Sequence, residues 1–216
     1  MKKITLITAF LTVLPLASFS QRLNLNAGTS FSKLDFNYEF SENLNGYNHF
    51  TVGSHISINY DYVEKSSFLL SSGIHYVQKG GQDEIPLVDM NGNYLGDITV
   101  YRHFNYVGAN TFINYKLEKL FLEKLHPYVF AGPRVDILLS EKSNDQLKLD
   151  GVNDIMIGFN GGIGLRYDWN RINLGFRAQY FQNFHPMYRR KEGEFSFVDA
   201  INDYTFSTQL SVGYNF

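Results

Sequence analysis

Apolar and polar residues alternate along the last thirteen positions of the chain, residues 204–216. Successive side chains of a β-strand point to opposite faces, so this pattern predicts a strand with one apolar, aromatic face and one face of small polar residues. Only Thr208 interrupts the apolar row. The six residues of that row are Tyr204, Phe206, Leu210, Val212, Tyr214 and Phe216.

The same period of two recurs in seven earlier segments. In most of them one face is rich in Leu, Ile, Val and aromatics, and the other carries Asn, Ser, Gly and charged residues. The segment 101–115 alternates weakly, so its apolar face stays undecided. Pro133 cannot donate a ladder hydrogen bond and predicts a local bulge. The seven segments are residues 23–31, 50–62, 67–79, 101–115, 127–139, 155–168 and 172–181.

The connections between these strands alternate between short and long. Residues 80–99 carry Asn91-Gly92, the strongest short hairpin signal, and predict a β-ribbon above the membrane. Residues 116–125 place apolar residues at helical spacing, so a short interfacial helix and two strand overhangs both stay open. The sequence therefore predicts an all-β fold, an eight-stranded antiparallel up-and-down transmembrane β-barrel with short periplasmic turns and long outer loops.

Composition and the N-terminal segment support an exported membrane protein. Lys2 and Lys3, an apolar run over 4–16 and small residues up to Ser20 predict a signal peptide, residues 1–20, and a single barrel domain, residues 21–216. A transmembrane anchor is the alternative, but the run is shorter than the roughly 20 residues a span needs. Later segments lack an apolar run of that length, while aromatics make up 16% of the chain, as a membrane barrel allows.

Charge and cysteine content exclude some functions. Without Lys2 and Lys3 the chain has 17 Lys and Arg against 21 Asp and Glu, a formal charge of −4. This balance argues against nucleic acid as a partner. The chain has no cysteine, so it has neither disulfides nor thiolate chemistry.

The strand that ends on Phe216 resembles the closing strand of outer-membrane barrels, whose terminal aromatics are read by the insertion machinery. This implies an insertion signal at Tyr214 and Phe216. Residues 73–81 (GIHYVQKGG), 126–133 (HPYVFAGP) and 161–165 (GGIGL) resemble the PorT-type outer-membrane β-barrel domain family. The chain departs from that pattern at residues 105–109 (NYVGA), where an Ile-Pro pair is expected. The resemblance implies the outer membrane of a Gram-negative bacterium, no defined catalytic residues, and a link of some members to a protein secretion system.

Alternation places six charged residues inside the predicted barrel. An eight-stranded barrel has an interior just wide enough for side chains to fill, and buried charge is costly unless paired. A plug of salt bridges is therefore expected, with a proton or small-ion path as the alternative. The six residues are Asp61, Lys79, Arg134, Asp136, Arg166 and Arg177.

Three further groups of residues raise other chemistry. His55 and His75 face inward on adjacent strands with Asp61 near, but zinc sites usually need three or four ligands, so no metal or cofactor is predicted. Histidines 49, 103 and 185 lie near loops with Ser41, Ser54 or Asp97 as conceivable partners, yet no motif marks a nucleophile, and no catalytic residue is predicted. A cluster in the last loop could bind anions such as lipopolysaccharide phosphates or an acidic partner. Its residues are His185, Tyr188, Arg189, Arg190 and Lys191, and a solvated loop balanced by Glu192 and Glu194 is the plainer interpretation.

These patterns predict a non-catalytic barrel with a structural or interaction role in the cell envelope. Its four outer loops would contact lipid headgroups, envelope proteins or secretion components. A lipid-modifying barrel enzyme is one alternative. A soluble, lipocalin-like barrel, with its apolar faces turned inward around a ligand, is another.

Overall fold

The computed structural model describes residues 21–38, 47, 49–117, 124–144, 151–190 and 198–216. Their regular structure is entirely β, and no described helix is long and apolar enough to cross a membrane. The predicted signal peptide, residues 1–20, lies outside the described residues, as do residues 118–123 of the segment for which a helix stayed open. The strands are β1 Arg22–Tyr38, β2 Thr51–Glu64, β3 Phe68–Val88, β4 Tyr94–Lys116, β5 Leu125–Ser143, β6 Ile155–Trp169, β7 Ile172–Asn183, β8 Tyr188–Arg189 and β9 Val198–Asn215.

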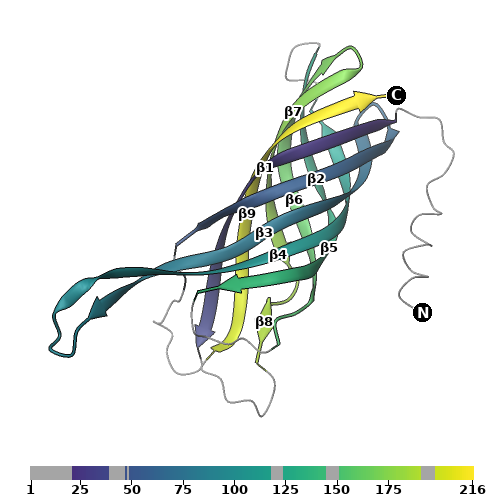
Figure 1. Cartoon of the computed structure of the whole chain (residues 1–216). Helices are drawn as coiled ribbons and strands as arrows, with labels where there is room; N and C mark the ends of the chain where they lie inside the picture. The colour runs from purple at the N-terminus through teal and green to yellow at the C-terminus, as the bar shows by residue number, and fades with distance from the viewer. Residues whose placement is uncertain (1–20, 39–46, 48, 118–123, 145–150, 191–197) are drawn as a thin grey trace.

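Eight of these strands close into a barrel, as predicted (Figure 1). Each pairs antiparallel with the next, and β1 pairs with β9 over nearly its whole length, which leaves no open edge in the wall. Closure satisfies the backbone without water, which a membrane span requires. The two-residue β8 was not predicted, and it adds to β9 beyond the barrel wall. We call the end with the short turns, Gln21 and Phe216 the terminal end, and the opposite end the loop end.

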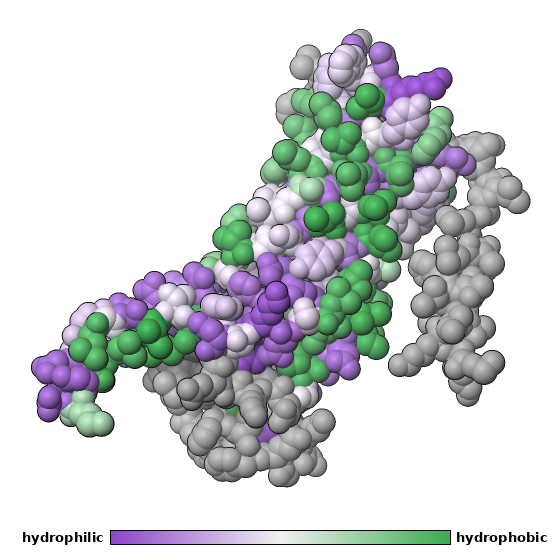
Figure 2. Space-filling model, viewed as in Figure 1, coloured by the Kyte–Doolittle hydropathy of each residue, from purple (hydrophilic) through white to green (hydrophobic). Residues whose placement is uncertain are grey.

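The apolar rows face outward and the polar rows face inward. Leu210 and Ile163 are 71% and 62% exposed on the outer wall, whereas Asn26 and Lys79 are 1% and 0% exposed inside. Hydrophobic side chains spread along the barrel wall in Figure 2. The lipocalin-like alternative is therefore wrong, because it requires the opposite orientation.

Exposed aromatic side chains lie near both ends of the apolar wall. At the terminal end they are Phe68, Tyr115, Tyr167, Trp169, Tyr214 and Phe216; toward the loop end they are Phe50, Phe159, Tyr180, Tyr204 and Phe206. Tyr204 and Tyr214 are ten positions apart on β9, about 33 Å along a strand. At a tilt of about 40° this gives a height of about 25 Å, which matches the apolar band of outer-membrane barrels.

The strands are longer at the loop end than the sequence pattern predicts. β1 continues to Tyr38, β5 to Ser143, and β9 begins at Val198. Beyond the apolar band the outer faces no longer need apolar residues, so backbone pairing continues where the alternation fades. The predicted ribbon is confirmed: β3 and β4 remain paired as far as Val88 and Tyr94 and project from the barrel (Figure 1).

Two details of the middle strands go beyond the sequence pattern or correct it. On β4 the even-numbered residues face inward, among them Phe104, Tyr106, Asn110 and Phe112, which settles the undecided parity.

The bulge predicted at Pro133 is wrong. The β4–β5 register is the same on both sides of Pro133, and it shifts instead where Asn105 and Tyr106 oppose Ser140 and Leu138. The ladder absorbs the missing donor of Pro133 without an extra residue.

Candidate functional site

An apolar cluster fills the loop end of the interior, where the sequence had predicted only polar contents. Most of its side chains are below 4% exposed, and the rings of Phe36 and Tyr47 stack with centroids 5.0 Å apart. We call this cluster the apolar cap. Its members are Leu34, Phe36, Tyr47, Val77, Val100, Phe104, Tyr106, Met156, Phe181, Met187, Tyr188, Val198 and Ile201.

Beneath the cap, two cations and two carboxylates form a buried cluster, the central cluster, of Lys79, Arg134, Asp136 and Asp203. Lys79 Nζ lies 3.2 Å from Asp203 Oδ2 and 3.6 Å from Asp136 Oδ2. Arg134 donates to Asp136, and His75 Nε2 lies 3.0 Å from Asp136 Oδ1. The four formal charges sum to zero. Three of these residues were predicted to face inward, whereas Asp203 lies one residue before the predicted closing strand, 204–216.

Aromatic rings enclose the central cluster. Lys79 Nζ lies 5.2 Å from the centroid of the Phe181 ring, and Arg134 Cζ lies 5.0 Å from it. Both distances allow cation–π attraction, which strengthens when water is excluded. The cap and this cluster together fill the loop end and the middle of the lumen, so the described side chains leave this part of the barrel packed rather than open.

A second charged group, the terminal cluster, lies at the terminal end of the interior. Its members are Arg22, Asp61, Glu64, Lys116, Arg166 and Asp168. Arg22 lies 3.4 Å from Asp61, Lys116 donates to Glu64 over 2.6 Å, and Arg166 Nε lies 3.1 Å from Asp168. The six charged residues predicted to face inward are therefore divided: Asp61 and Arg166 belong here, and Lys79, Arg134 and Asp136 belong to the central cluster.

Arg177, the sixth predicted residue, joins neither cluster. Its guanidinium carbon lies 4.2 Å from the Phe130 ring centroid and 5.0 Å from that of Phe112. Phe130 and Tyr128 lie directly opposite Gly162 and Gly164 of β6. A Cβ at Gly164 would lie 2.2 Å from Tyr128 Cζ, so glycine is what leaves space for the ring. The two motifs HPYVFAGP and GGIGL thus pack against each other and form an aromatic shelf below Arg177.

The two interior histidines approach each other without a third ligand. The rings of His55 and His75 meet edge to face with centroids 5.8 Å apart, and His55 Nδ1 lies 2.9 Å from Ser207 Oγ. Asp61, suggested as a third ligand, instead accepts from Asn24 and lies beside Arg22. Among the residues described, no three metal-ligating side chains gather at one point.

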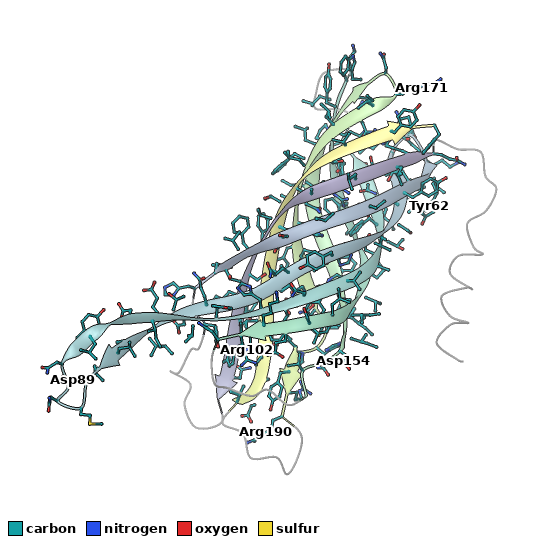
Figure 3. The ribbon with its side chains drawn as sticks, viewed as in Figure 1. Tyr62, Asp89, Arg102, Asp154, Arg171 and Arg190 are labelled. Carbon is teal, nitrogen blue, oxygen red and sulfur yellow. The ribbon has the colours of Figure 1, made fainter. Side chains whose placement is uncertain are left out.

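The cationic residues of the last loop do not form one surface. Tyr188 is 3% exposed and packs into the apolar cap, while Arg190 pairs with Asp199 at 2.9 Å. His185 Nε2 accepts the backbone N–H of Ile157 at 3.3 Å. Arg189 is exposed on β8, and Lys191 lies outside the described residues. Figure 3 shows Arg190, Asp154 and Arg102 toward the loop end.

The histidines weighed as catalytic bases have other partners. His49 lies 3.6 Å from Asp83, and His103 Nε2 lies 3.0 Å from Thr51 Oγ1. Of the suggested nucleophiles and acids, Ser54 lies on the exposed outer face, Asp97 accepts from the Tyr94 hydroxyl, and Ser41 lies outside the described residues. The described residues therefore do not bring a base beside any of these partners.

The projecting part of β3 and β4 forms a two-stranded ribbon, residues 83–100. Asp89 closes its tip by accepting the N–H groups of Asn91 and Asn93, each at 2.8 Å, and Gly92 supplies the positive φ of 84°. Hydrogen bonds from Asn93 and Asn91 also hold the pKa of Asp89 below its usual value. Figure 3 places Asp89 at the far end of the ribbon.

The predicted insertion signal lies on the outer face at the end of β9, with Phe216 one residue beyond the strand. Tyr214 and Phe216 are 43% and 73% exposed, and their rings meet edge to face with centroids 5.3 Å apart. Arg171 of the β6–β7 turn lies 3.5 Å from the Tyr214 hydroxyl. Figure 3 shows Arg171 at the terminal end.

Comparison with known proteins identifies the fold. No protein-family model matches the sequence, and no curated protein does. The outer membrane protein OprG from Pseudomonas aeruginosa is 10% identical, with a TM-score of 0.50 over 91% of this chain and 96% of OprG. A major outer membrane protein from Thermus thermophilus is 12% identical, with a TM-score of 0.50 over 91% of this chain and 99% of that chain. The chain has the fold of a small outer-membrane β-barrel.

Proposed function

We propose that this protein is a closed, non-catalytic barrel of the outer membrane that binds a protein partner through its ribbon. One observation carries the proposal: the ribbon exposes a row of apolar side chains beyond the membrane-facing wall. Ile85, Leu87 and Ile98 are 45%, 40% and 43% exposed, and the cross-strand pairing places all three on one face. Figure 2 shows hydrophobic side chains on the ribbon, separate from those of the barrel wall.

The ribbon also has one backbone edge suited to a partner strand. The side chain of Asn144 accepts a hydrogen bond from Tyr101 N–H and donates one to Thr99 C=O. The odd-numbered residues of β4 therefore direct their backbone N–H and C=O groups away from β3, toward the free edge of the strand. Asp97 is the next such residue, and it lies beyond Asn144. The other edge carries Pro86, a residue that blocks strand addition. An extended segment can therefore add to the β4 edge and place alternate apolar side chains beside the apolar face of the ribbon.

The charge of the ribbon favours one class of partner over the others. Residues 80–101 contain Asp83, Glu84, Asp89 and Asp97 and neither Lys nor Arg, a formal charge of −4. A second copy of the ribbon and an anionic lipid surface would both be repelled. A basic extended segment of another envelope protein fits the apolar face and the acidic edge.

The remaining parts of the proposal rest on the sequence. Membership of the PorT-type family, residues 1–20 as a signal peptide, and the outer membrane of a Gram-negative bacterium as location agree with the barrel fold. A secretion-system component would be a partner of the proposed class. The exposed rings of Tyr214 and Phe216 are available to the insertion machinery during assembly.

The test uses the protein refolded in detergent and two synthetic nine-residue peptides, one alternating Lys and Val and one alternating Glu and Val. We expect the Lys peptide to bind by fluorescence anisotropy and to weaken with salt, and the Glu peptide not to bind. Replacing residues 83–100 by Asn-Gly should abolish binding, while different mobility of boiled and unboiled protein in SDS verifies the barrel. Equal binding of both peptides, or binding that survives loss of the ribbon, would refute the proposal.

A further inference from the structure

A cavity lies inside the barrel at its terminal end, between the terminal cluster and the aromatic shelf. Its volume is ≈ 40 Å³, enough for a small ion or a few waters but not for a large solute. Arg22, Lys116 and Arg166 line it toward the terminal end, and Arg177 lines it at depth. Its walls are therefore rich in positive charge.

Counting the charged side chains around this cavity leaves one cation without a counter-charge. Among the described residues, Arg22, Lys116 and Arg166 are matched by the three carboxylates of Asp61, Glu64 and Asp168, which lie within 3.8 Å of them. With Arg177 the described Lys, Arg, Asp and Glu side chains here make four cations against three carboxylates; His126 also lines the cavity, lies 3.3 Å from Asp168 and is not counted. The central cluster above is balanced within itself, so it supplies no spare carboxylate.

Arg177 is also the group whose hydrogen bonds are missing. It is 6% exposed, and its Nε and Nη2 have no partner in the described part of the chain. These two nitrogens form one edge of the guanidinium plane, the edge that binds a carboxylate or another oxyanion through two parallel hydrogen bonds. The Phe112 and Phe130 rings hold the plane but offer no acceptor for that edge.

Two amide side chains add donors to the same cavity. Asn173 and Asn59 are 1% and 2% exposed, both line the cavity, and the Nδ2 of each has no partner among the described residues. Buried polar groups without partners are rare in folded proteins and indicate a bound water, ion or ligand. The Oδ1 atoms of Asn26 and Asn59, which also line the cavity, have no described partner either, so the lining offers acceptors as well as donors. The positively charged edge of Arg177 is therefore the feature that favours an anion over water alone.

We propose that this cavity binds a monovalent oxyanion of the carboxylate class. The Nε and Nη2 of Arg177 would donate hydrogen bonds to its two oxygens, and the side-chain amides of Asn59 and Asn173 would donate further hydrogen bonds to them. Two sources share this chemistry: a free small carboxylate, and the C-terminal carboxylate of a peptide that enters from the terminal end.

The experiment measures binding to the folded protein in a non-ionic detergent, in a buffer whose only other anion is a bulky sulfonate. Carbon-13 formate and acetate are titrated by NMR line broadening, with sulfate as a divalent competitor. We expect saturable binding of one formate per barrel, and we expect sulfate to bind the same site more weakly than formate does. The two sources are distinguished with trialanine that has a free C-terminus and trialanine with an amidated C-terminus. If only the free form binds, the site accepts the C-terminal carboxylate of a peptide as well as formate. If neither form binds, the ligand is a small free carboxylate.

Three variants locate the site. Arg177→Met should weaken formate binding at least tenfold, and Arg177→Lys should do the same because it keeps the charge but loses the two-pronged edge. Arg171→Met, on the exposed β6–β7 turn, is the matched control and should leave binding unchanged. Boiled and unboiled mobility verifies folding, and the Lys variant serves if the Met variant does not fold. Absence of saturable formate binding, or equal affinity in the wild type and in an Arg177 variant that folds, would overturn the proposal.

Discussion

The charge balance of the central cluster should control the stability of the barrel. Asp136 accepts from Arg134 and His75 and lies 3.6 Å from Lys79 Nζ, and all four side chains are at most 2% exposed. Asp136→Asn keeps the volume of the side chain but leaves two cations against the single carboxylate of Asp203. Lys79→Met leaves the opposite imbalance, and the double variant restores a net charge of zero.

The magnitude follows from the cost of a buried charge without its partner. Removing one partner of a buried ion pair costs about 3–5 kcal/mol, so each single variant should lower the free energy of unfolding by that amount. The double variant should cost less than the sum of the singles by up to about 3 kcal/mol, because neither remaining charge is unbalanced. This deficit is the coupling between Lys79 and Asp136.

Urea unfolding in phospholipid vesicles measures these differences. Trp169 is the one tryptophan of the chain and is 60% exposed at the β6–β7 turn, so its fluorescence reports on loss of the barrel. Asp199→Asn is the matched control: it removes a carboxylate from a partly exposed pair with Arg190 and should cost less than about 1 kcal/mol. Single variants no more costly than this control, or a strictly additive double variant, would refute the reasoning.

Three further predictions concern the wall, and the same unfolding assay checks each. Gly164→Ala should cost about 1–3 kcal/mol, because its Cβ would lie 2.2 Å from Tyr128 Cζ, whereas Gly161→Ala, whose Cβ would meet nothing closer than 3.8 Å, should be tolerated; similar costs would contradict the aromatic shelf. Ile163→Lys, 62% exposed midway along β6, should cost about 2–4 kcal/mol in a bilayer, while Met90→Lys at the ribbon tip should change stability by less than about 0.5 kcal/mol. On the outer wall, Thr29 Oγ1 and Thr208 Oγ1 lie 3.3 Å apart. Thr29→Val should cost about 1 kcal/mol, because it leaves the Thr208 hydroxyl without this partner, and the double variant with Thr208→Val should recover most of that loss.

The alternation of side chains was enough to predict the barrel, its eight strands and the inward side of most charged residues. It could not predict which charges meet, because that depends on the stagger between strands that are distant in sequence. Lys79 and Asp203 are 124 positions apart, and they pair only because closure of β1 on β9 brings β9 near β3. Asp203 was missed although it continues the inward row of Thr205, Ser207 and Gln209, a signal present in the sequence.

The apolar cap was missed for a different physical reason. Leu34, Phe36, Val198 and Ile201 lie beyond the apolar band, where outer faces are wet and inner faces can be apolar, so the usual relation between polarity and face no longer holds. Tyr188 reaches the cap from a segment that resembled a cationic loop, because β8 pairs with β9 and turns this ring inward. A pattern that identifies strands in a membrane therefore fails where strands leave it, and the ribbon and the cap both lie there.

The two motifs HPYVFAGP and GGIGL acquire a physical meaning from the packing. The rings of Tyr128 and Phe130 occupy space left by Gly164 and Gly162, and Phe130 in turn supports Arg177. A guanidinium held on aromatic faces keeps its hydrogen-bonding edge free, whereas one held by a carboxylate does not. The same residues that pack β5 against β6 thus leave the Nε and Nη2 of Arg177 without a partner in the described part of the chain, beside the cavity that we propose as the site of a small anion.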